Sequence, residues 1–176
     1  MRTYIRSRAS GAAYFFTVNL ADRHGRPLLI EYIADLRSAF RHVRQAHPFL
    51  LDAIVVLPDH LHCIWQLPEN DADFSTRWRL IKARFSRSVA QGERISPSRA
   101  RKGERGIWQR RLWEHTIRDE ADYGRHLDYI HYNPVKHGHA SSPSEWAYSS
   151  FANCVKRGWY PSDWAASDEV RELEFE

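Results

Sequence analysis

Two histidines stand one residue apart in the segment PDHLHCIW (58–65), directly after the apolar run AIVVL (53–57). Successive side chains of a β-strand point to opposite faces, so His60 and His62 are expected on one face of a strand. Neutral imidazole is a common ligand of divalent metals, and two imidazoles on one strand supply two rigid ligands. The pair is a candidate metal site, although two half-exposed histidines without a metal also fit this motif.

A second group of polar residues lies on a helix predicted to follow Asp119, whose side chain suits an N-cap. One stripe of this helix is apolar, and a second carries polar groups at helical spacing: Asp122, His126, Tyr129 and Asn133. Tyr129 and Asn133 are four residues apart and therefore neighbours on one helix face. If this face packs over the histidines, Asn133 is a candidate third metal ligand and Tyr129 points at a bound phosphate.

These residue types together suit phosphoryl transfer. A metal ion polarises a scissile phosphate and stabilises the charge that develops on it. A tyrosine hydroxyl is a feasible nucleophile, and its phosphotyrosine product preserves the bond energy for religation, which a water nucleophile does not. Tyr132 is a less favoured nucleophile because it lies off the polar stripe. The simpler alternative for Tyr129 is an aromatic ring packed on the sheet with its hydroxyl at the rim.

Positive charge is concentrated in one part of the chain. Residues 77–118 hold thirteen Lys or Arg and three acids, whereas residues 162–176 hold six acids and one Arg. Clustering of this kind is typical of a surface that binds a nucleic-acid backbone, although a solvated basic face is the alternative. The acidic end is a candidate shield for the basic surface when DNA is absent.

The predicted elements define an α+β fold. Strands are expected at 13–20, 50–57 and 61–67 and near the end of 107–118, and helices at 29–45, at 75–90 and from Asp119 to about 132. Asn133-Pro134 is expected to stop the last helix, leaving 135–176 irregular. The Gly/Ser/Arg-rich loop 92–106 is predicted to be mobile until it binds a partner. This order predicts a ferredoxin-like antiparallel sheet with an additional helix.

The 176 residues suit a single catalytic domain over 1–165, followed by an acidic tail at 166–176. No apolar run is long enough to span a membrane, and the N-terminus does not look like a signal peptide. The two cysteines, Cys63 and Cys154, are too few for a disulfide framework. A cytoplasmic, nucleoid-associated protein without membrane contact is therefore expected.

Four segments in this order resemble the REP-associated tyrosine transposases, which are single-tyrosine members of the HUH endonucleases: PDHLHCIW, FSTRWRLIKARF, IWQRRLWEHTIRDEADY and HLDYIHYNPVKHG. The resemblance covers roughly residues 10–165. It implies a ferredoxin-like sheet, a Mg²⁺ or Mn²⁺ site, and cleavage of single-stranded DNA with the 5′-phosphate linked to tyrosine. By position, His60 and His62 are implied metal ligands and Tyr129 is the implied nucleophile. Insertion-sequence relatives carry glutamine where this chain has Asn133.

The implied substrates are repetitive extragenic palindromes (REPs) folded into hairpins. The basic residues expected to hold the hairpin backbone are Arg77, Arg79, Lys82 and Arg84, and those expected near the cleavage site are Arg110 and Arg111. Phosphate contacts fix register without reading sequence, so unpaired bases need stacking partners as well. Three tryptophans are available for stacking, although each also suits a core position: Trp78, Trp108 and Trp113.

The leading hypothesis is a metal-dependent single-stranded DNA endonuclease and strand transferase acting through a 5′-phosphotyrosine intermediate. One alternative is a protein of the same fold that binds DNA hairpins without cutting them. Another is a metal-dependent hydrolase that uses water, for which a Tyr129→Phe variant would still cut. Both a monomer with the tyrosine acting in cis and a homodimer are compatible with the sequence.

Overall fold

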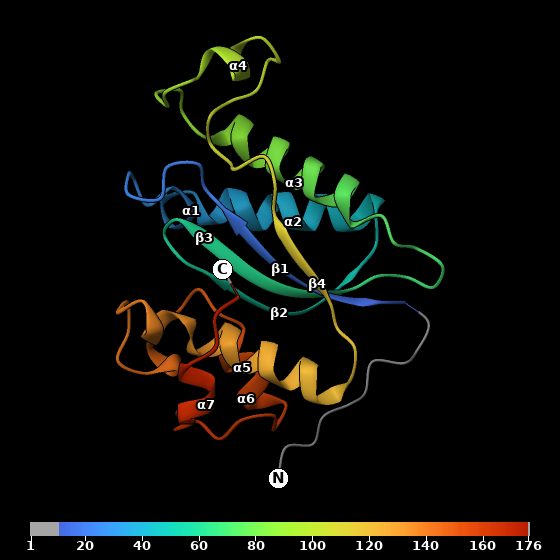
Figure 1. Cartoon of the computed structure of the whole chain (residues 1–176), viewed down its shortest axis with the longest axis vertical. Helices are drawn as coiled ribbons and strands as arrows, with labels where there is room; N and C mark the ends of the chain where they lie inside the picture. The colour runs from blue at the N-terminus through green and yellow to red at the C-terminus, as the bar shows by residue number, and fades with distance from the viewer. Residues whose placement is uncertain (1–10, 176) are drawn as a thin grey trace.

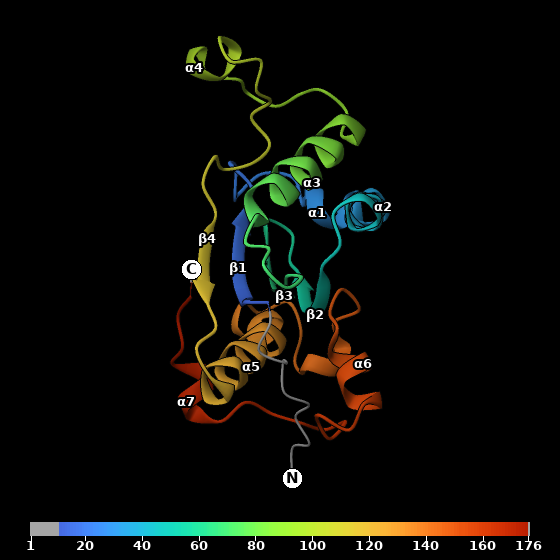
Figure 2. The same ribbon diagram turned by 90° about the vertical axis from the view of Figure 1, so that its right-hand side faces the viewer.

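A four-stranded antiparallel sheet forms the middle layer of the computed structural model, which describes residues 11–175. The strands are β1 (Ala13–Asn19), β2 (Leu50–Val56), β3 (His60–Gln66) and β4 (Trp113–Thr116), in the order β2-β3-β1-β4. Helices cover both faces (Figures 1 and 2). This arrangement confirms the predicted α+β fold with a ferredoxin-like sheet, and the hairpin predicted over 50–67 is the β2–β3 pair.

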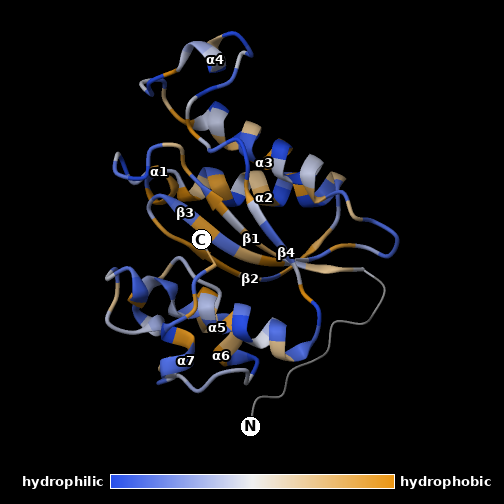
Figure 3. Cartoon of the chain, viewed as in Figure 1, coloured by the Kyte–Doolittle hydropathy of each residue, from blue (hydrophilic) through white to orange (hydrophobic). Residues whose placement is uncertain are grey.

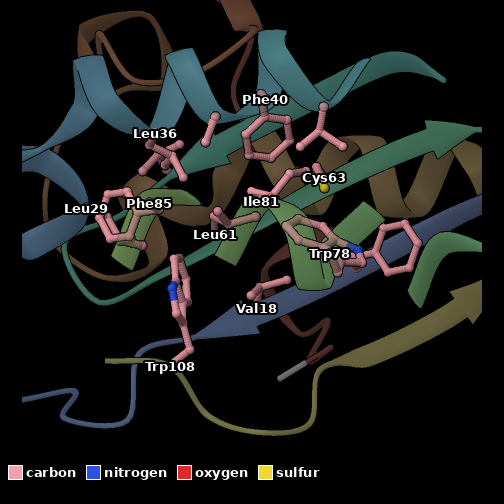
Figure 4. Packing of buried hydrophobic residues seen from close by; sticks show 14 of the residues in the cluster. Val18, Leu29, Leu36, Phe40, Leu61, Cys63, Trp78, Ile81, Phe85 and Trp108 are labelled. Atoms are coloured by element: carbon pink, nitrogen blue, oxygen red, sulfur yellow. The ribbon is translucent and has the colours of Figure 1, made fainter. Parts of the chain in front are cut away.

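One face of the sheet packs against α1 (Leu28–Glu31), α2 (Ile33–Ala46) and α3 (Phe74–Ser88). The predicted helix over 29–45 is divided at Tyr32, which caps both α1 and α2. Alternate residues of β3 and the predicted apolar stripe of α3 meet in this core, part of which is drawn in Figure 4: Leu61, Cys63, Trp65, Trp78, Ile81 and Phe85. Every second residue of the strand and the apolar stripe of the helix therefore face each other, and together they form one continuous core.

The other face of the sheet packs against α5 (Glu120–Lys136), followed by a 3₁₀ turn η1 (Pro143–Glu145), α6 (Phe151–Lys156) and α7 (Asp168–Arg171). The Asp119 carboxylate accepts a hydrogen bond from the Asp122 N–H at 2.8 Å, which confirms the predicted N-cap. The apolar stripe of α5 is buried as predicted, through Tyr123, Leu127 and Ile130. Its polar stripe is buried too, so these side chains face the sheet.

The predicted end of the helix at residue 132 is wrong, because α5 continues through Pro134 to Lys136. Proline lacks an N–H and removes one helical hydrogen bond, but it can stay in a last turn that is stabilised otherwise. Here the Pro134 side chain is buried, and its carbonyl accepts from the His139 N–H at 2.8 Å. The expectation of an irregular 135–176 segment is also wrong, since η1, α6 and α7 lie there.

The loop 92–106 contains a short helix, α4 (Pro97–Ala100), and stands away from the sheet in Figure 1. Its base is held by Arg105, which pairs with Glu93 at 2.5 Å and donates to the carbonyl of Val89 at 2.7 Å. Figure 3 shows this region as largely hydrophilic, while hydrophobic residues gather along the strands and on α1 and α2. These contacts tie the base of the loop to the end of α3, and the mobility expected of the loop stays a prediction.

The chain after α7 returns to the sheet and lies beside β4 (Figure 2). Ala166 and Val170 are buried, and Phe175 packs against the second core. The acidic end thus lies on the α5 side of the sheet, away from the basic face of α3, so it does not cover that face as hypothesised. A domain boundary at residue 165 stays a prediction. Across residues 11–175, no helix is both long and apolar enough to cross a membrane.

Candidate active site

The two histidines of the HxH motif open β3 and are buried, with 1% of His60 and none of His62 exposed. Their ring centroids lie 4.9 Å apart, at a steep interplanar angle of 80°. The strand therefore brings both imidazoles together on one face, as the alternation of side chains predicts. Contrary to the alternative of a half-exposed pair, both rings are withdrawn from solvent.

Asp59 orients His60. The His60 Nδ1–H donates to the Asp59 carboxylate at 2.7 Å, and the other carboxylate oxygen accepts from Arg23 Nε, also at 2.7 Å. Burial alone would raise the pKa of Asp59, but the hydrogen bonds from His60 and Arg23 outweigh it and hold the pKa well below its usual range. Asp59 is thus ionised, and the proton on Nδ1 leaves the lone pair of His60 on Nε2.

Thr17 on β1 orients His62. The Thr17 hydroxyl donates to the carbonyl of Phe175 at 2.7 Å, so its oxygen accepts from the His62 Nδ1–H at 2.8 Å. Burial is the main cause that holds the pKa of His62 well below its usual range. His62 is therefore neutral, with its lone pair on Nε2, which is the state that binds a metal.

α5 lays three residues over the histidine pair at successive turns: Tyr129, Asn133 and His137. The Tyr129 ring lies 5.2 Å from the His62 ring, and the His137 ring lies 5.1 Å from the His60 ring. Asn133 is midway between these two contacts on the same helix face, so it faces the histidines. His137 was missed in the sequence because the helix was expected to end before it; continuing the i, i+4 spacing finds it.

The donor set fits a divalent metal. Three side chains place buried polar atoms here that have no hydrogen-bond partner among the described residues: Nε2 of His60, Nε2 of His62, and both amide atoms of Asn133. Buried polar groups are almost always satisfied, so an unpartnered group of this kind needs an explanation. Two imidazole nitrogens and an amide oxygen, each pointing from a fixed element, match what a metal ion takes as ligands.

Tyr129 has no exposed surface, because the end of the chain covers it. The Phe175 ring lies 5.0 Å from the Tyr129 ring, edge to face. Lys136 Nζ lies 5.0 Å from the centroid of the same tyrosine and donates to the carbonyl of Leu173 at 2.8 Å. Nothing in the sequence pattern indicated that residues 173–175 close over the candidate nucleophile.

A second polar cluster beside this site consists of His115, Asp122 and His126, whose ligand atoms lie within 4.8 Å of one another. His115 donates to the Asp122 carboxylate at 2.8 Å; although burial opposes it, this bond lowers the pKa of Asp122 to about 2. The two imidazoles are stacked at 4.6 Å with an interplanar angle of 14°. An imidazole binds a metal in its ring plane, so stacked rings cannot share one ion, and the cluster is not assigned as a metal centre.

A groove of about 930 Å³ runs between α3 and residues 99–114. Four of the predicted DNA-binding residues line it: Arg79, Lys82, Arg110 and Arg111. Three further arginines line it as well: Arg87, Arg99 and Arg105. Only two acids, Glu104 and Glu114, are among its lining residues. Arg84 is half-buried on α3 and does not line the groove. The groove is therefore a strongly positive surface on the opposite side of the sheet from the histidine pair.

Arg77 does not belong to this surface. The residue is 3% exposed, and its guanidinium donates to the carbonyls of Pro48 and Asp73, at 2.8 Å each, and to the Asp71 carboxylate at 2.7 Å. A guanidinium whose donors are used inside the protein has none left for a phosphate. The expected role of Arg77 in DNA binding is therefore corrected to a structural one.

A ferredoxin-like sheet that brings two histidines against a helix-borne tyrosine is the arrangement expected of a tyrosine transposase. The chain is 46% identical over 165 residues to a REP-associated tyrosine transposase of Escherichia coli, covering 94% of this chain and 92% of the relative. It is 44% identical over 172 residues to a Haemophilus influenzae protein described as a candidate member of the same family, covering 97% of both chains.

A solved structure of a REP-associated tyrosine transposase bound to a REP hairpin has the same fold. The TM-score is 0.78 at 46% identity, over 95% of this chain and 93% of the other. No family model matches the chain. With relatives this similar over nearly its whole length, the chain belongs to the REP-associated tyrosine transposases. This confirms the family resemblance, and the family implies a divalent metal.

Proposed function

We propose that this chain cleaves and rejoins single-stranded DNA at REP hairpins, with Tyr129 as the nucleophile. The observation that carries the proposal is the packing of Tyr129 against His62, one helical turn from Asn133, where three side chains hold unpartnered buried polar atoms. The solved relative with the same fold is bound to a REP hairpin. The candidate nucleophile and the candidate metal ligands thus lie together in a fold whose solved relative is bound to a REP hairpin.

His60, His62 and Asn133 would hold the metal ion through Nε2, Nε2 and the amide oxygen. A divalent ion bound there would stabilise the negative charge that develops on the phosphate. The two imidazoles favour Mn²⁺ over Mg²⁺, because Mg²⁺ is bound mainly by oxygen ligands. Asp59 and Thr17 keep the imidazoles in the tautomer that presents Nε2.

The Tyr129 oxygen attacks the scissile phosphorus and forms the bond to the 5′-phosphate. The bond from phosphorus to the 3′-oxygen breaks, the phenolic proton is released, and the 3′-oxygen takes up a proton as the leaving hydroxyl. The Lys136 ammonium beside the tyrosine ring favours negative charge at this point. The reverse attack by a 3′-hydroxyl religates a strand without an external energy source.

The basic groove would hold the phosphate backbone of the hairpin through Arg79, Lys82, Arg110 and Arg111. Its seven Lys and Arg against two Glu supply the charge for this contact. Contacts to phosphate set the register of the strand and do not read its sequence. The groove and the tyrosine lie on opposite layers, so a bound strand has to pass the β4 edge of the sheet between them.

The test uses a labelled single-stranded REP hairpin with Mn²⁺ and denaturing gels. Wild type and Phe175→Ala, which uncovers Tyr129, are expected to give a metal-dependent covalent protein–DNA band. Tyr129→Phe is expected to bind the hairpin and to give no band, and Tyr132→Phe is the matched control that keeps it. Cleavage surviving in Tyr129→Phe would contradict the proposal and favour a water-using nuclease, and binding without any band would favour the non-cleaving alternative.

We also propose that the site is assembled in cis, as expected for a working monomer. Tyr129 contacts His62 of the same chain, and both are fully buried in that contact. Mixing His62→Ala with Tyr129→Phe should then restore no cleavage. Recovery of the covalent band in the mixture would instead indicate a homodimer that exchanges its tyrosine helices.

A further inference from the structure

Four flat rings beside Tyr129 lie nearly parallel. Trp113 and His115 stand side by side on one face of β4, 5.9 Å apart at 6°. His126 on α5 is stacked on His115 at 14°, and Phe175 is also stacked on His126, with 4.2 Å between centroids at 18°. Phe175 is also parallel to Trp113, at 6.1 Å and 20°. The Phe175 ring therefore occupies a slot whose walls are aromatic.

This slot is connected to both the nucleophile and the solvent. The Phe175 ring meets Tyr129 edge to face at 5.0 Å. Trp113 is 39% exposed and is one of only three large hydrophobic residues exposed in the described part of the chain. Of the three tryptophans considered for stacking, Trp78 and Trp108 are buried at 2% and 6% exposure. Of these three tryptophans, Trp113 alone is exposed enough to meet an incoming ring.

The backbone of residues 173–175 takes up donors that suit phosphate oxygens. Lys136 Nζ donates to the carbonyl of Leu173 at 2.8 Å, and the Thr17 hydroxyl donates to the carbonyl of Phe175 at 2.7 Å. Both donors adjoin the candidate machinery, since Lys136 lies beside Tyr129 and Thr17 bonds to His62. Lysine and threonine are common donors to DNA phosphates. The segment thus brings an aromatic ring and two acceptor oxygens to the site.

One polar atom at the wall of the slot has no partner. His126 is 1% exposed, and its Nδ1–H donates to the carbonyl of Asp122 at 2.8 Å. Its Nε2 therefore keeps a lone pair, and this atom is buried without a hydrogen-bond partner among residues 11–175. This lone pair lies in the plane of the imidazole, so its donor has to approach from the ring edge and cannot be a base stacked on the ring.

We propose that the slot filled by Phe175 is a binding site for one unpaired nucleobase next to the phosphate that Tyr129 attacks. The base would stack between His126 and Trp113, and residues 173–175 occupy its place when no DNA is bound. This inference rests on the proposed function, because it assumes a DNA strand at Tyr129. Stacking accepts every base, since all bases have a flat face.

The experiment measures the affinity of full-length Phe175→Ala for hairpin oligonucleotides that carry a single abasic nucleotide at successive positions around the cleavage point. One position is expected at which loss of the base weakens binding by roughly 5- to 100-fold, the range for one stacked base. In Phe175→Ala combined with Trp113→Ala this penalty should fall to about 2-fold or less, because the stacking partner is gone. Trp113→Phe keeps a flat ring and should retain most of the penalty.

Trp159→Ala is the control, because Trp159 lies beside α6 and outside the slot, and it should leave the abasic profile unchanged. The proposal is overturned if no position is sensitive, or if the sensitive position keeps its full penalty in Trp113→Ala. Because binding is the readout, this result is independent of cleavage. Absence of a covalent band with an intact Trp113-dependent profile would contradict the proposed chemistry and leave the base site standing.

Discussion

Thr17 decides which nitrogen of His62 is available to a metal. Its hydroxyl gives its only proton to the carbonyl of Phe175, so it can act only as an acceptor towards Nδ1 of His62. Asp59 does the same for His60 through a carboxylate. Residues that orient metal-binding histidines in this way set the tautomer and the ring position.

Thr17→Val is expected to weaken metal binding by about 10- to 100-fold, because the valine side chain leaves the His62 Nδ1–H without an acceptor. Isothermal titration of the folded protein with Mn²⁺ measures this directly. Thr17→Ser keeps the hydroxyl and should bind the metal close to the wild-type affinity. Equal affinities for Val and Ser variants would show that this hydrogen bond does not orient the histidine.

Lys82 combines a role in the groove with a cost in stability. Burial lowers the pKa of Lys82 to about 8, although its Nζ donates to the carbonyl of Gln109 at 3.1 Å. Below pH 8 the lysine is charged in both the folded and the unfolded chain, so the desolvation cost is fully present. Between pH 8 and its unfolded pKa near 10.5 the unfolded chain binds more protons, and stability rises with pH.

Lys82→Met should therefore raise the free energy of unfolding at pH 7 by about 1 kcal/mol, while weakening binding to the hairpin. The stability difference from wild type should shrink between pH 8 and pH 10. Urea unfolding at several pH values checks both statements. A variant that is less stable than wild type at pH 7 would show that the contacts of the ammonium outweigh its burial.

At the scale of elements, α5 brings the chemistry together and α3 carries the DNA surface. Because α5 continues through Pro134, His137 lies one turn beyond Asn133 and meets the His60 ring. α3 begins with a cap from Asp73, whose carboxylate accepts from the Thr76 N–H at 2.9 Å. Arg77, in the next turn, ties this helix to the chain that enters β2.

Arg77→Met should lower the free energy of unfolding by about 2–3 kcal/mol, since several hydrogen bonds of a buried guanidinium are lost together. Thermal unfolding measures the loss. Arg87→Met, at an exposed position in the last turn of the same helix, is the matched control and should stay within about 0.5 kcal/mol of wild type. An unchanged stability together with weaker DNA binding would restore Arg77 to the DNA-binding residues.

The whole molecule separates two tasks on opposite sides of one sheet. The groove of α3 supplies positive charge, and the α5 side supplies the tyrosine and the metal ligands, while β4 and the end of the chain lie between them (Figure 2). A strand that uses both sides must therefore displace the chain at residues 173–175. Affinity from the groove is expected to depend on salt, because each phosphate contact releases condensed counterions.

Replacing Arg79 and Arg111 together by glutamine should reduce the slope of log affinity against log salt by about 1.5, which corresponds to two lost phosphate contacts. Fluorescence anisotropy with a labelled hairpin between low and physiological salt gives the slope. Arg41→Gln, on the exposed side of α2, removes a charge away from this groove and should leave the slope unchanged. A slope that is equally steep in the double variant would exclude the groove as the backbone site.

Local patterns in the sequence determined the elements and the reacting groups. The period of two in β3 was enough to place His60 and His62 on one face, and the helical period was enough to place Tyr129 and Asn133 on another. Both placements depend only on the geometry of one strand or one helix, so they can be predicted without knowing the tertiary structure. The family resemblance then joined the two faces into one site.

The tertiary structure alone decided what surrounds these groups. Whether Arg77 meets DNA or backbone carbonyls of its own chain depends on where residues 47–48 lie. The length of α5 past Pro134 depends on packing that outweighs local preference. Thr17 and Phe175 are 158 residues apart, yet their hydrogen bond selects the tautomer of His62 and closes the site. Contacts between such distant residues leave no periodic trace in the sequence, because they arise only when the whole chain has packed.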